Sequence, residues 1–389
     1  MEPLHQDDPK WSDWRWQEKQ AITNIRGLRA HCPNLHEQYD RMVSEWGKRG
    51  LRFKFTPYVL SLVRKDETGN PKQDDPVWRL SFPAFNELLT RRPPRPDEYS
   101  CELENWEEPG EMLTPIAHWK YDNRIILYIA ESCLGYCPYC LRSLQSLAAE
   151  ERHGSVTSEW RATMQAIRDH SQIEEVILSG GDPLVFTNHV IDRMLQDIRE
   201  ISSVRAVRMN TRVLTHNPFR VDKDFCALLH AHRVTELGIH VVHPREITDE
   251  FCAAIDRIRA SGGRTMLLAQ TPLIKGVNDS ADVLRELFMG LYVAGVKPYY
   301  LLHNMPNIPA ASSQRTSVRR GVELMLSLKR HISNPAMPEY IIVGKTGKKT
   351  VPLELDGTPE FQHEKNSDGY PIIRFKNWKG EWVEYLDTP

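Results

Sequence analysis

The run Glu131-Ser-Cys-Leu-Gly-Tyr-Cys-Pro-Tyr-Cys-Leu-Arg142 places three cysteines, Cys133, Cys137 and Cys140, in one short segment. Their spacing is C-x3-C-x2-C, and an aromatic residue, Tyr139, precedes the last cysteine. Three thiolates on one loop can hold three irons of a [4Fe–4S] cluster and leave the fourth iron open to a substrate or cofactor, whereas ferredoxin-type sites use four cysteines. The segment therefore predicts an iron–sulfur cluster with one open iron.

A zinc site and unliganded cysteines are the alternatives. Structural zinc normally takes four ligands, arranged as a C-x2-4-C pair followed by a second pair. No second pair follows here: Cys101 lies more than thirty residues upstream, and Cys226 and Cys252 are isolated, as expected of small buried apolar residues. Seven cysteines in 389 residues are also few and odd in number for a disulfide framework.

The composition is that of an ordinary soluble globular protein, with 40% hydrophobic residues, 26% charged residues and a mean hydropathy of -0.50. No apolar run approaches the roughly 18 residues of a membrane span, and the N-terminus lacks the pattern of a secretory signal. The formal net charge of -2 gives no sign of a nucleic-acid surface. We therefore expect a cytoplasmic protein without membrane or nucleic-acid partners, since that compartment suits free thiols and a cluster.

The pattern along the chain predicts three regions. Residues 1–115 are helical and charged, with a first helix capped by Ser12 or Asp13 and a linker at residues 92–96, where three prolines interrupt any helix. Residues 116–333 alternate between β-rich runs and helical stretches. Residues 334–389 form a C-terminal segment with a hairpin around residues 377–382.

The central region is predicted to be a parallel sheet covered by helices. Six units rather than eight favour an open partial barrel. Active sites of α/β barrels lie at the C-terminal strand ends, and the cysteine run follows such an end. The predicted strands span residues 124–130, 175–179, 206–210, 236–240, 264–269 and 297–302, and the predicted helices lie near residues 157–169, 187–200, 222–232, 247–261, 280–294 and 313–331.

The cysteine spacing and its aromatic residue resemble the motif of radical S-adenosylmethionine (SAM) enzymes, and further segments resemble the lysine 2,3-aminomutase family over nearly the whole chain. These segments occur in the family's order and spacing. They are Asp13-Trp-Arg-Trp-Gln17, Leu178-Ser-Gly-Gly-Asp-Pro-Leu184, His240-Val-Val-His-Pro-Arg-Glu-Ile-Thr248, Gly276-Val-Asn-Asp279 and Lys297-Pro-Tyr-Tyr300.

The resemblance implies a partial (β/α)6 radical SAM barrel with a helical N-terminal extension and a small C-terminal segment that binds pyridoxal 5′-phosphate (PLP). It implies three cofactors, namely a [4Fe–4S] cluster, SAM and PLP. The implied activity is that of an isomerase, an aminomutase that moves the α-amino group of a free L-amino acid to the β-carbon. The resemblance also implies a homo-oligomer and an electron donor such as flavodoxin or ferredoxin.

Several strand-end residues are candidates for binding SAM. The glycines of the Ser179–Asp182 segment let the backbone approach a ligand and expose amides to it, although a plain turn is the alternative. Arg212 can hold a carboxylate bidentately, with a surface ion pair as the alternative. His240 and His243 lack a third metal ligand nearby, which leaves a neutral hydrogen-bonding role or a core position. The SAM candidates are Tyr139, Ser179, Gly180, Gly181, Asp182, Thr211, Arg212, His240, His243 and Gln270.

The PLP and substrate contacts come from the resemblance. Tyr121 and Arg124 match positions that contact PLP in the family, and Arg142 matches the arginine that binds the substrate carboxylate, for which a planar guanidinium is suited.

The lysine that binds PLP must offer an accessible amine beside a loop that the phosphate can approach. The family places it after a glycine-rich run, which here reads Val343-Gly-Lys-Thr-Gly-Lys-Lys-Thr-Val-Pro-Leu353. Lys349 is our first choice, followed by Lys348 and then Lys345.

The substrate site departs from the family pattern. Lysine-acting members grip the distal ammonium with two aspartates, one near Asn304 and Met305 and the other near Val343, and none of these positions is acidic here. Burying an ammonium without a counter-charge costs several kcal/mol, so lysine bound in the usual way is disfavoured. The C-terminal cysteines that bind zinc in some members are also absent.

Three other functions stay open from the sequence. The degraded glycine run allows a radical SAM enzyme of this family without PLP. A 2,3-aminomutase acting on a lysine within a protein such as a translation factor is the second. An iron–sulfur electron-transfer protein is the third, and it leaves the glycine motif and Arg212 without a role.

Overall fold

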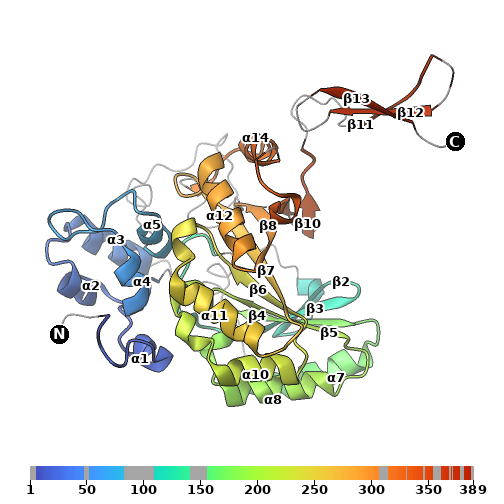
Figure 1. Cartoon of the computed structure of the whole chain (residues 1–389). Coiled ribbons are helices and arrows are strands. Elements are labelled where there is room, and N and C mark those ends of the chain that lie inside the picture. The colour runs from blue at the N-terminus through green and yellow to red at the C-terminus, as the bar shows by residue number, and fades with distance from the viewer. Residues whose placement is uncertain are drawn as a thin grey trace.

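A ten-stranded mixed sheet forms the centre of the computed structural model, with its strands in chain order from β1 to β10 (Figure 1). Its strands are β1 Met112–Thr114, β2 Ala117–Tyr121, β3 Arg124–Ala130, β4 Glu175–Gly180, β5 Ala206–Thr211, β6 Glu236–His240, β7 Met266–Leu273, β8 Lys297–His303, β9 Glu339–Gly344 and β10 Gly347–Thr350. The structure describes residues 6–47, 52–82, 109–140, 156–305, 314–329, 331–344, 347–353, 361–367, 369, 371–376 and 381–386.

The strands from β3 to β9 pair in parallel, and β1, β2 and β10 are antiparallel additions at the two edges. All six predicted strands are present, but the parallel strands number seven. The additional strand is β9, which lies within residues 334–389, the region predicted to be a separate C-terminal segment. Because β9 pairs with β8, the main sheet continues past residue 334.

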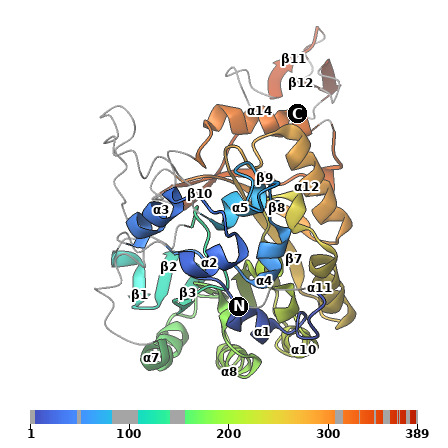
Figure 2. The ribbon, with the colours of Figure 1, turned by 90° about the vertical axis from the view of Figure 1, so that its left-hand side faces the viewer.

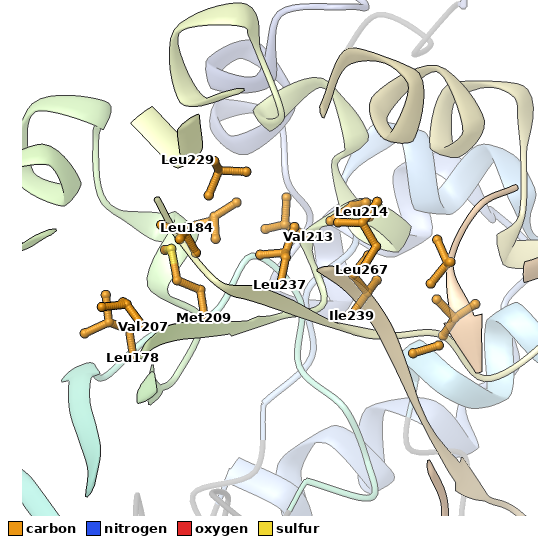
Figure 3. Packing of buried hydrophobic residues seen from close by; sticks show 14 of the residues in the cluster. Leu178, Leu184, Val207, Met209, Val213, Leu214, Leu229, Leu237, Ile239 and Leu267 are labelled. Carbon is orange, nitrogen blue, oxygen red and sulfur yellow. The ribbon is translucent and has the colours of Figure 1, made fainter. Parts of the chain in front are cut away.

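Helices cover one face of this sheet and confirm all six predicted helical stretches. They are α7 Val156–Asp169, α8 Asn188–Arg199, α10 Lys223–Ala231, α11 Asp249–Ala260, α12 Ala281–Val293 and α14 Val318–Leu328. The apolar side chains between helices and sheet form the main core, in which Val207, Met209, Leu237 and Ile239 are fully buried (Figure 3).

The opposite face of the sheet carries polar residues, because successive side chains of a strand point to opposite faces. Val207 and Met209 of β5 enter the helix-covered core, so Arg208 and Asn210 lie on the other side. We call this side the polar face. By the same alternation it carries Arg124, Glu175, Arg208, Asn210, Glu236, His240 and Tyr300.

Among the described residues before the sheet are five short helices, which lie near the C-terminal ends of the central strands (Figure 2). Stacked aromatic residues hold them together: the rings of Trp78 and Phe82 are 4.3 Å apart, and those of Phe55 and Trp78 are 5.5 Å apart. Asp13 caps the first helix through the amide of Arg15, as predicted. The helices are α1 Trp14–Lys19, α2 Ile25–His31, α3 Gln38–Gly47, α4 Pro57–Leu62 and α5 Pro76–Ser81.

A separate antiparallel sheet lies near the C-terminus and consists of β11 Phe361–Lys365, β12 Pro371–Lys376 and β13 Trp382–Leu386. The pairing of β12 with β13 confirms the hairpin predicted around residues 377–382. The linker predicted at residues 92–96 lies outside the described residues. No helix in the described ranges is long and apolar enough to cross a membrane.

Candidate active site at the strand ends and the polar face

The cysteine loop follows β3 at its C-terminal end, as the sequence predicts. Burial and then the nearby Cys140, Asp182 and Cys137 raise the pKa of Cys133 well above its ordinary value, so the three thiols share one region. Over the described residues, no three His, Cys, Asp or Glu side chains converge on a position for a metal ion. A [4Fe–4S] cluster does not require the three thiolates to converge on one ion, because each thiolate binds a different iron.

The glycine motif packs tightly against the start of the cysteine loop. The amide of Gly181 donates to the carbonyl of Ala130 at 2.5 Å, and the amide of Asp182 donates to the carbonyl of Ser132 at 3.0 Å. A side chain at Gly181 would place its Cβ 2.2 Å from the Ser132 oxygen, and Gly180 has a φ of +108°. The glycines therefore permit one backbone to cross another, and two of the amides expected to face a ligand are already bonded within the protein.

Asp182 ties β4 to the end of β5. Its buried carboxylate accepts from the Thr211 hydroxyl at 2.8 Å and from the amides of Arg212 at 2.8 Å and Leu184 at 3.0 Å. Burial raises the pKa of Asp182, and these hydrogen bonds oppose that rise. Asp182 and Thr211 thus fix the position from which Arg212 projects.

Arg212 forms a buried ion pair, which rules out the surface ion pair that the sequence left open. Only 7% of the residue is exposed. One terminal nitrogen, Nη2, donates to Glu246 Oε1 at 3.0 Å, and Nη1 lies 2.6 Å from Cys137 Sγ. The guanidinium carbon is 5.2 Å from the centre of the Tyr139 ring. The Nε of Arg212 and the hydroxyl of Tyr139 are buried without a hydrogen-bond partner among the described residues.

Glu246 was not singled out from the sequence, although it lies within the quoted motif from His240 to Thr248. Besides Arg212, its carboxylate accepts from the amides of Val242 at 2.6 Å and His243 at 3.1 Å. The ring Nδ1 of His243 accepts from the amide of Arg245, so His243 caps the short helix that contains Glu246.

His240 and Gln270 lie on the polar face beside each other. Burial, Arg212 and Lys348 lower the pKa of His240 to about 4, so its ring is neutral at pH 7. Gln270 Nε2 donates to Asn210 Oδ1 at 3.3 Å. This contact crosses Gly238, where an added Cβ would lie 2.2 Å from Asn210 Oδ1.

Lys348 of β10, and not Lys349, reaches the predicted PLP residues. Its amide donates to the Tyr121 hydroxyl at 3.0 Å, and its Nζ lies 4.7 Å from the centre of the Tyr300 ring on the polar face. The guanidinium carbon of Arg124 lies 4.1 Å from the centre of the Tyr121 ring. Lys349 follows Lys348 in the strand and therefore points to the opposite face. The preference for Lys349 is not supported by this geometry.

Lys348 is accessible to solvent, yet protein atoms surround its amine. The side chain is exposed, while burial, Arg208 and Arg124 lower its pKa to about 8 and Glu236 opposes them. Lys345 and Arg142 lie outside the described residues.

The predicted substrate positions lie around the same face. Val343 pairs with Lys348 across β9 and β10, so the two side chains are neighbours. Asn304 is buried, and its side-chain Nδ2 donates to the Gln314 carbonyl at 3.3 Å. Met305 packs against a cluster that contains Tyr139, beside the cysteine loop.

Comparison with known proteins finds several relatives that align along nearly the whole chain. The glutamate 2,3-aminomutase of Clostridioides difficile (strain 630) is 27% identical over 386 residues, which cover 99% of this chain and 85% of that protein. The L-lysine 2,3-aminomutases of Clostridium subterminale and Methanococcus maripaludis are 28% and 27% identical, and cover 98% and 97% of this chain and 85% and 82% of their own lengths.

Among solved structures, a radical SAM methyltransferase from Sphaerobacter thermophilus aligns with a TM-score of 0.36 and 18% identity, covering 61% of this chain and 73% of that one. No family model matches the chain. The relatives that align along nearly the whole chain are named 2,3-aminomutases of amino acids, which are isomerases. The chain is therefore similar over nearly its whole length to members of the lysine 2,3-aminomutase family.

Proposed function

We propose that this protein is a radical SAM, PLP-dependent aminomutase that moves the α-amino group of a free L-amino acid to the β-carbon. The observation that carries the proposal is the position of Lys348. Its backbone amide donates to the Tyr121 hydroxyl, its side chain neighbours Val343 across the strand pair, and its amine lies over the Tyr300 ring on the polar face, on the same sheet whose strand ends carry the cysteine loop. A PLP-binding lysine and a radical-generating cluster require this shared face.

The residues near the cysteine loop fit a cluster and SAM. Cys133, Cys137 and Cys140 would each hold one iron. The unpartnered Tyr139 hydroxyl and Arg212 Nε are buried polar atoms beside them, and such atoms normally have a partner. SAM would supply both a carboxylate for the arginine and polar atoms for the tyrosine. When bound, SAM and the reduced cluster supply the 5′-deoxyadenosyl radical.

The residues near Lys348 fit PLP. Arg124 forms no ion pair within the described part of the chain, and its guanidinium rests on the Tyr121 ring, so a cation is available for a phosphate. Lys348 would hold the cofactor by its amine. PLP, when bound, spreads the unpaired electron over its π-system during migration of the nitrogen.

We propose that the substrate is not lysine bound in the family's usual way. It is either another amino acid or an amino acid held by different contacts. Asn304, Met305 and Val343 provide no carboxylate for a distal ammonium, and an unpaired ammonium is costly to bury. The relatives include enzymes named for glutamate as well as for lysine, so the family accommodates more than one side chain. The proposal includes a cytoplasmic homo-oligomer that receives electrons from a flavodoxin or ferredoxin.

The test is an anaerobic assay of the reconstituted protein with SAM, reductant, PLP and a pool of the twenty amino acids, read by mass spectrometry after derivatisation. We expect one new β-isomer. The matched variants Lys348→Ala and Lys349→Ala separate the two lysines: only Lys348→Ala should lose the visible absorbance of bound PLP. Formation of 5′-deoxyadenosine with neither a β-isomer nor bound PLP would refute the aminomutase assignment.

A further inference from the structure

His216 packs against the cysteine loop at a position between its first two cysteines. The residue is buried, with only 2% of its surface exposed. A side chain at Gly135 would place its Cβ 1.8 Å from His216 Cδ2 and 2.4 Å from His216 Nε2, so only a glycine lets the loop pass the ring this closely. The edge of the ring that carries Nε2 therefore faces the backbone between Cys133 and Cys137.

Neighbouring contacts hold His216 in this place. It ends the short helix α9 Val213–His216, and Arg212, four residues earlier, lies on the same side of the turn. The Nη1 of Arg212 lies 2.6 Å from Cys137 Sγ, so this side of the turn faces the cysteine loop. The backbone carbonyl of His216 accepts from the buried Thr56 hydroxyl at 2.6 Å, which joins the turn to the N-terminal helices.

The ring nitrogen Nε2 of His216 is buried without a hydrogen-bond partner in the part of the chain that the structure describes, and such atoms normally have one. Burial and then Arg212 lower the pKa of His216 well below its ordinary value, so the ring is neutral and carries one proton. The Thr215 hydroxyl lies 3.1 Å from Nδ1 and 3.0 Å from the Arg212 carbonyl, which also accepts from the Thr215 amide at 3.2 Å. The hydroxyl can therefore donate to Nδ1, and the ring proton then lies on Nε2.

We propose that His216 donates a hydrogen bond from Nε2 to a sulfur of the iron–sulfur cluster and thereby raises the reduction potential of the cluster. The acceptor is a cysteine thiolate or a bridging sulfide. Hydrogen bonds to sulfur are among the factors that set this potential, and they stabilise the reduced cluster more than the oxidised one because it carries more negative charge. One electron enters the cluster from the electron donor, and the proton stays on Nε2. The inference rests on the cluster of the proposed function, but not on PLP or on the identity of the substrate.

The packing of His216 against the loop can be tested by itself. Gly135→Ala should lower the urea midpoint of the full chain, because the added methyl group overlaps the His216 ring. His216→Ala removes the ring, so the same Gly135→Ala substitution should cost less stability in that background. An equal cost in both backgrounds contradicts the contact and with it the proposal.

Two substitutions of His216 separate hydrogen bonding from packing. His216→Phe keeps a ring but has no N–H, so the ratio of reduced to oxidised cluster at a fixed potential should fall about tenfold, a shift of about 59 mV for one electron. His216→Gln offers an amide N–H in place of Nε2 and should restore most of the parent potential. His232→Phe is the control, since His232 pairs with Asp192 at the end of α10, and it should leave the potential unchanged.

The experiment is a redox titration of the reconstituted protein without substrate, in which EPR measures the reduced cluster. Iron and sulfide analysis and circular dichroism show whether each variant folds and holds the same amount of cluster. A lower potential in His216→Phe with recovery in His216→Gln supports the proposal, because a purely structural role would not follow the N–H. Pulsed EPR of the parent protein with isotope-labelled histidine should also show a weak nitrogen coupling to the reduced cluster, which His216→Gln loses.

An unchanged potential in His216→Phe, or a failure of His216→Gln to restore it, refutes this inference and leaves the proposed function intact. Should His216→Phe assemble no cluster, the pulsed EPR of the parent protein decides, and the absence of a histidine coupling refutes the inference. A parent protein that assembles no cluster refutes this inference and the proposed function together. A protein with the expected potentials but without bound PLP or a β-isomer keeps this inference and loses the proposed aminomutase activity.

Discussion

His303 shows how a single buried residue acquires a pH dependence. It ends β8, with 4% of its surface exposed. Its Nε2 faces Arg315 Nη2 at 3.4 Å, and an arginine can only donate. The proton of the neutral ring therefore lies on Nδ1, which donates to the Tyr340 hydroxyl at 2.8 Å. Burial and then Arg315 lower the pKa of His303 to about 4.

We predict that His303 makes the protein less stable in mild acid. Between about pH 4 and its unfolded pKa of about 6.5, the unfolded state binds more protons at this site than the folded state, so stability falls as the pH falls. From pH 7 to pH 5 the loss from this residue should be about 2 kcal/mol. Urea unfolding at both pH values would measure it.

In the His303→Gln variant, the loss of stability from pH 7 to pH 5 should be about 2 kcal/mol smaller than in the parent protein. The contributions of the other buried histidines should be unchanged. Comparing the difference between the two pH values, rather than stability at one, cancels any general cost of the substitution. An identical difference in the parent and the variant would show that His303 titrates normally in the folded protein.

At the scale of elements, β10 positions Lys348 through a glycine. Gly347 has a φ of +109°, and a Cβ there would lie 2.4 Å from the Tyr121 hydroxyl. The strand thereby approaches β2 closely enough for the Lys348 amide to reach Tyr121. Only glycine accepts both this backbone conformation and this approach without strain.

Gly347→Ala should therefore displace Lys348 and abolish PLP binding, and should destabilise the protein by more than about 1 kcal/mol. Gly69→Ala is the matched control: Gly69 has a φ of +80°, but an added Cβ meets no atom within 4 Å. The control should show the backbone strain without the loss of PLP absorbance. Equal PLP binding by the two variants would contradict the role assigned to the β2 contact.

Local patterns explain which elements could be predicted from the sequence. The six strands and six helices of the central region follow from hydrophobic periodicity, which neighbouring residues determine. The run from Tyr340 to Val343 was visible as apolar, but its place in the main sheet depends on pairing with β8, a contact distant in sequence. The short β1 and β2 were missed although their pairing is local, because runs of three and five residues show too little periodicity.

The site was predictable only where a motif marks it. The cysteine loop and the glycine motif were located by spacing, but the crossing of Gly181 over Ser132 needs the three-dimensional packing. Three lysines in one loop look alike in sequence. Lys348 is distinguished from Lys349 because β10 begins at Gly347, which sets the face each side chain occupies. The packing of His216 against Gly135 likewise depends on a contact between distant parts of the chain.

At the scale of the whole molecule, the N-terminal helices dock beside the cysteine loop. The Lys54 amine donates to the Cys133 carbonyl at 3.3 Å, and the Arg79 guanidinium donates to the Gly276 carbonyl at 2.6 Å. Asp75 is fully buried at this junction, where it pairs with Arg64 and Arg245 and caps α5 through the amide of Trp78. The N-terminal region thus supports one side of the candidate site.

Asp75→Asn should weaken this docking, because it leaves two arginines without their counter-charge. Removing one partner of a buried ion pair typically costs about 3–5 kcal/mol; solvent around the two half-exposed arginines should reduce the loss here to about 2–3 kcal/mol. Urea unfolding would measure the loss.

Limited proteolysis should cut the N-terminal region sooner, and reconstitution should yield less iron per chain, since Lys54 no longer holds the Cys133 backbone. The control Arg64→Gln removes only one of the two cations and should cost less. If Asp75→Asn unfolds like the parent and binds as much iron, then the aromatic cluster, and not Asp75, holds the N-terminal region against the sheet.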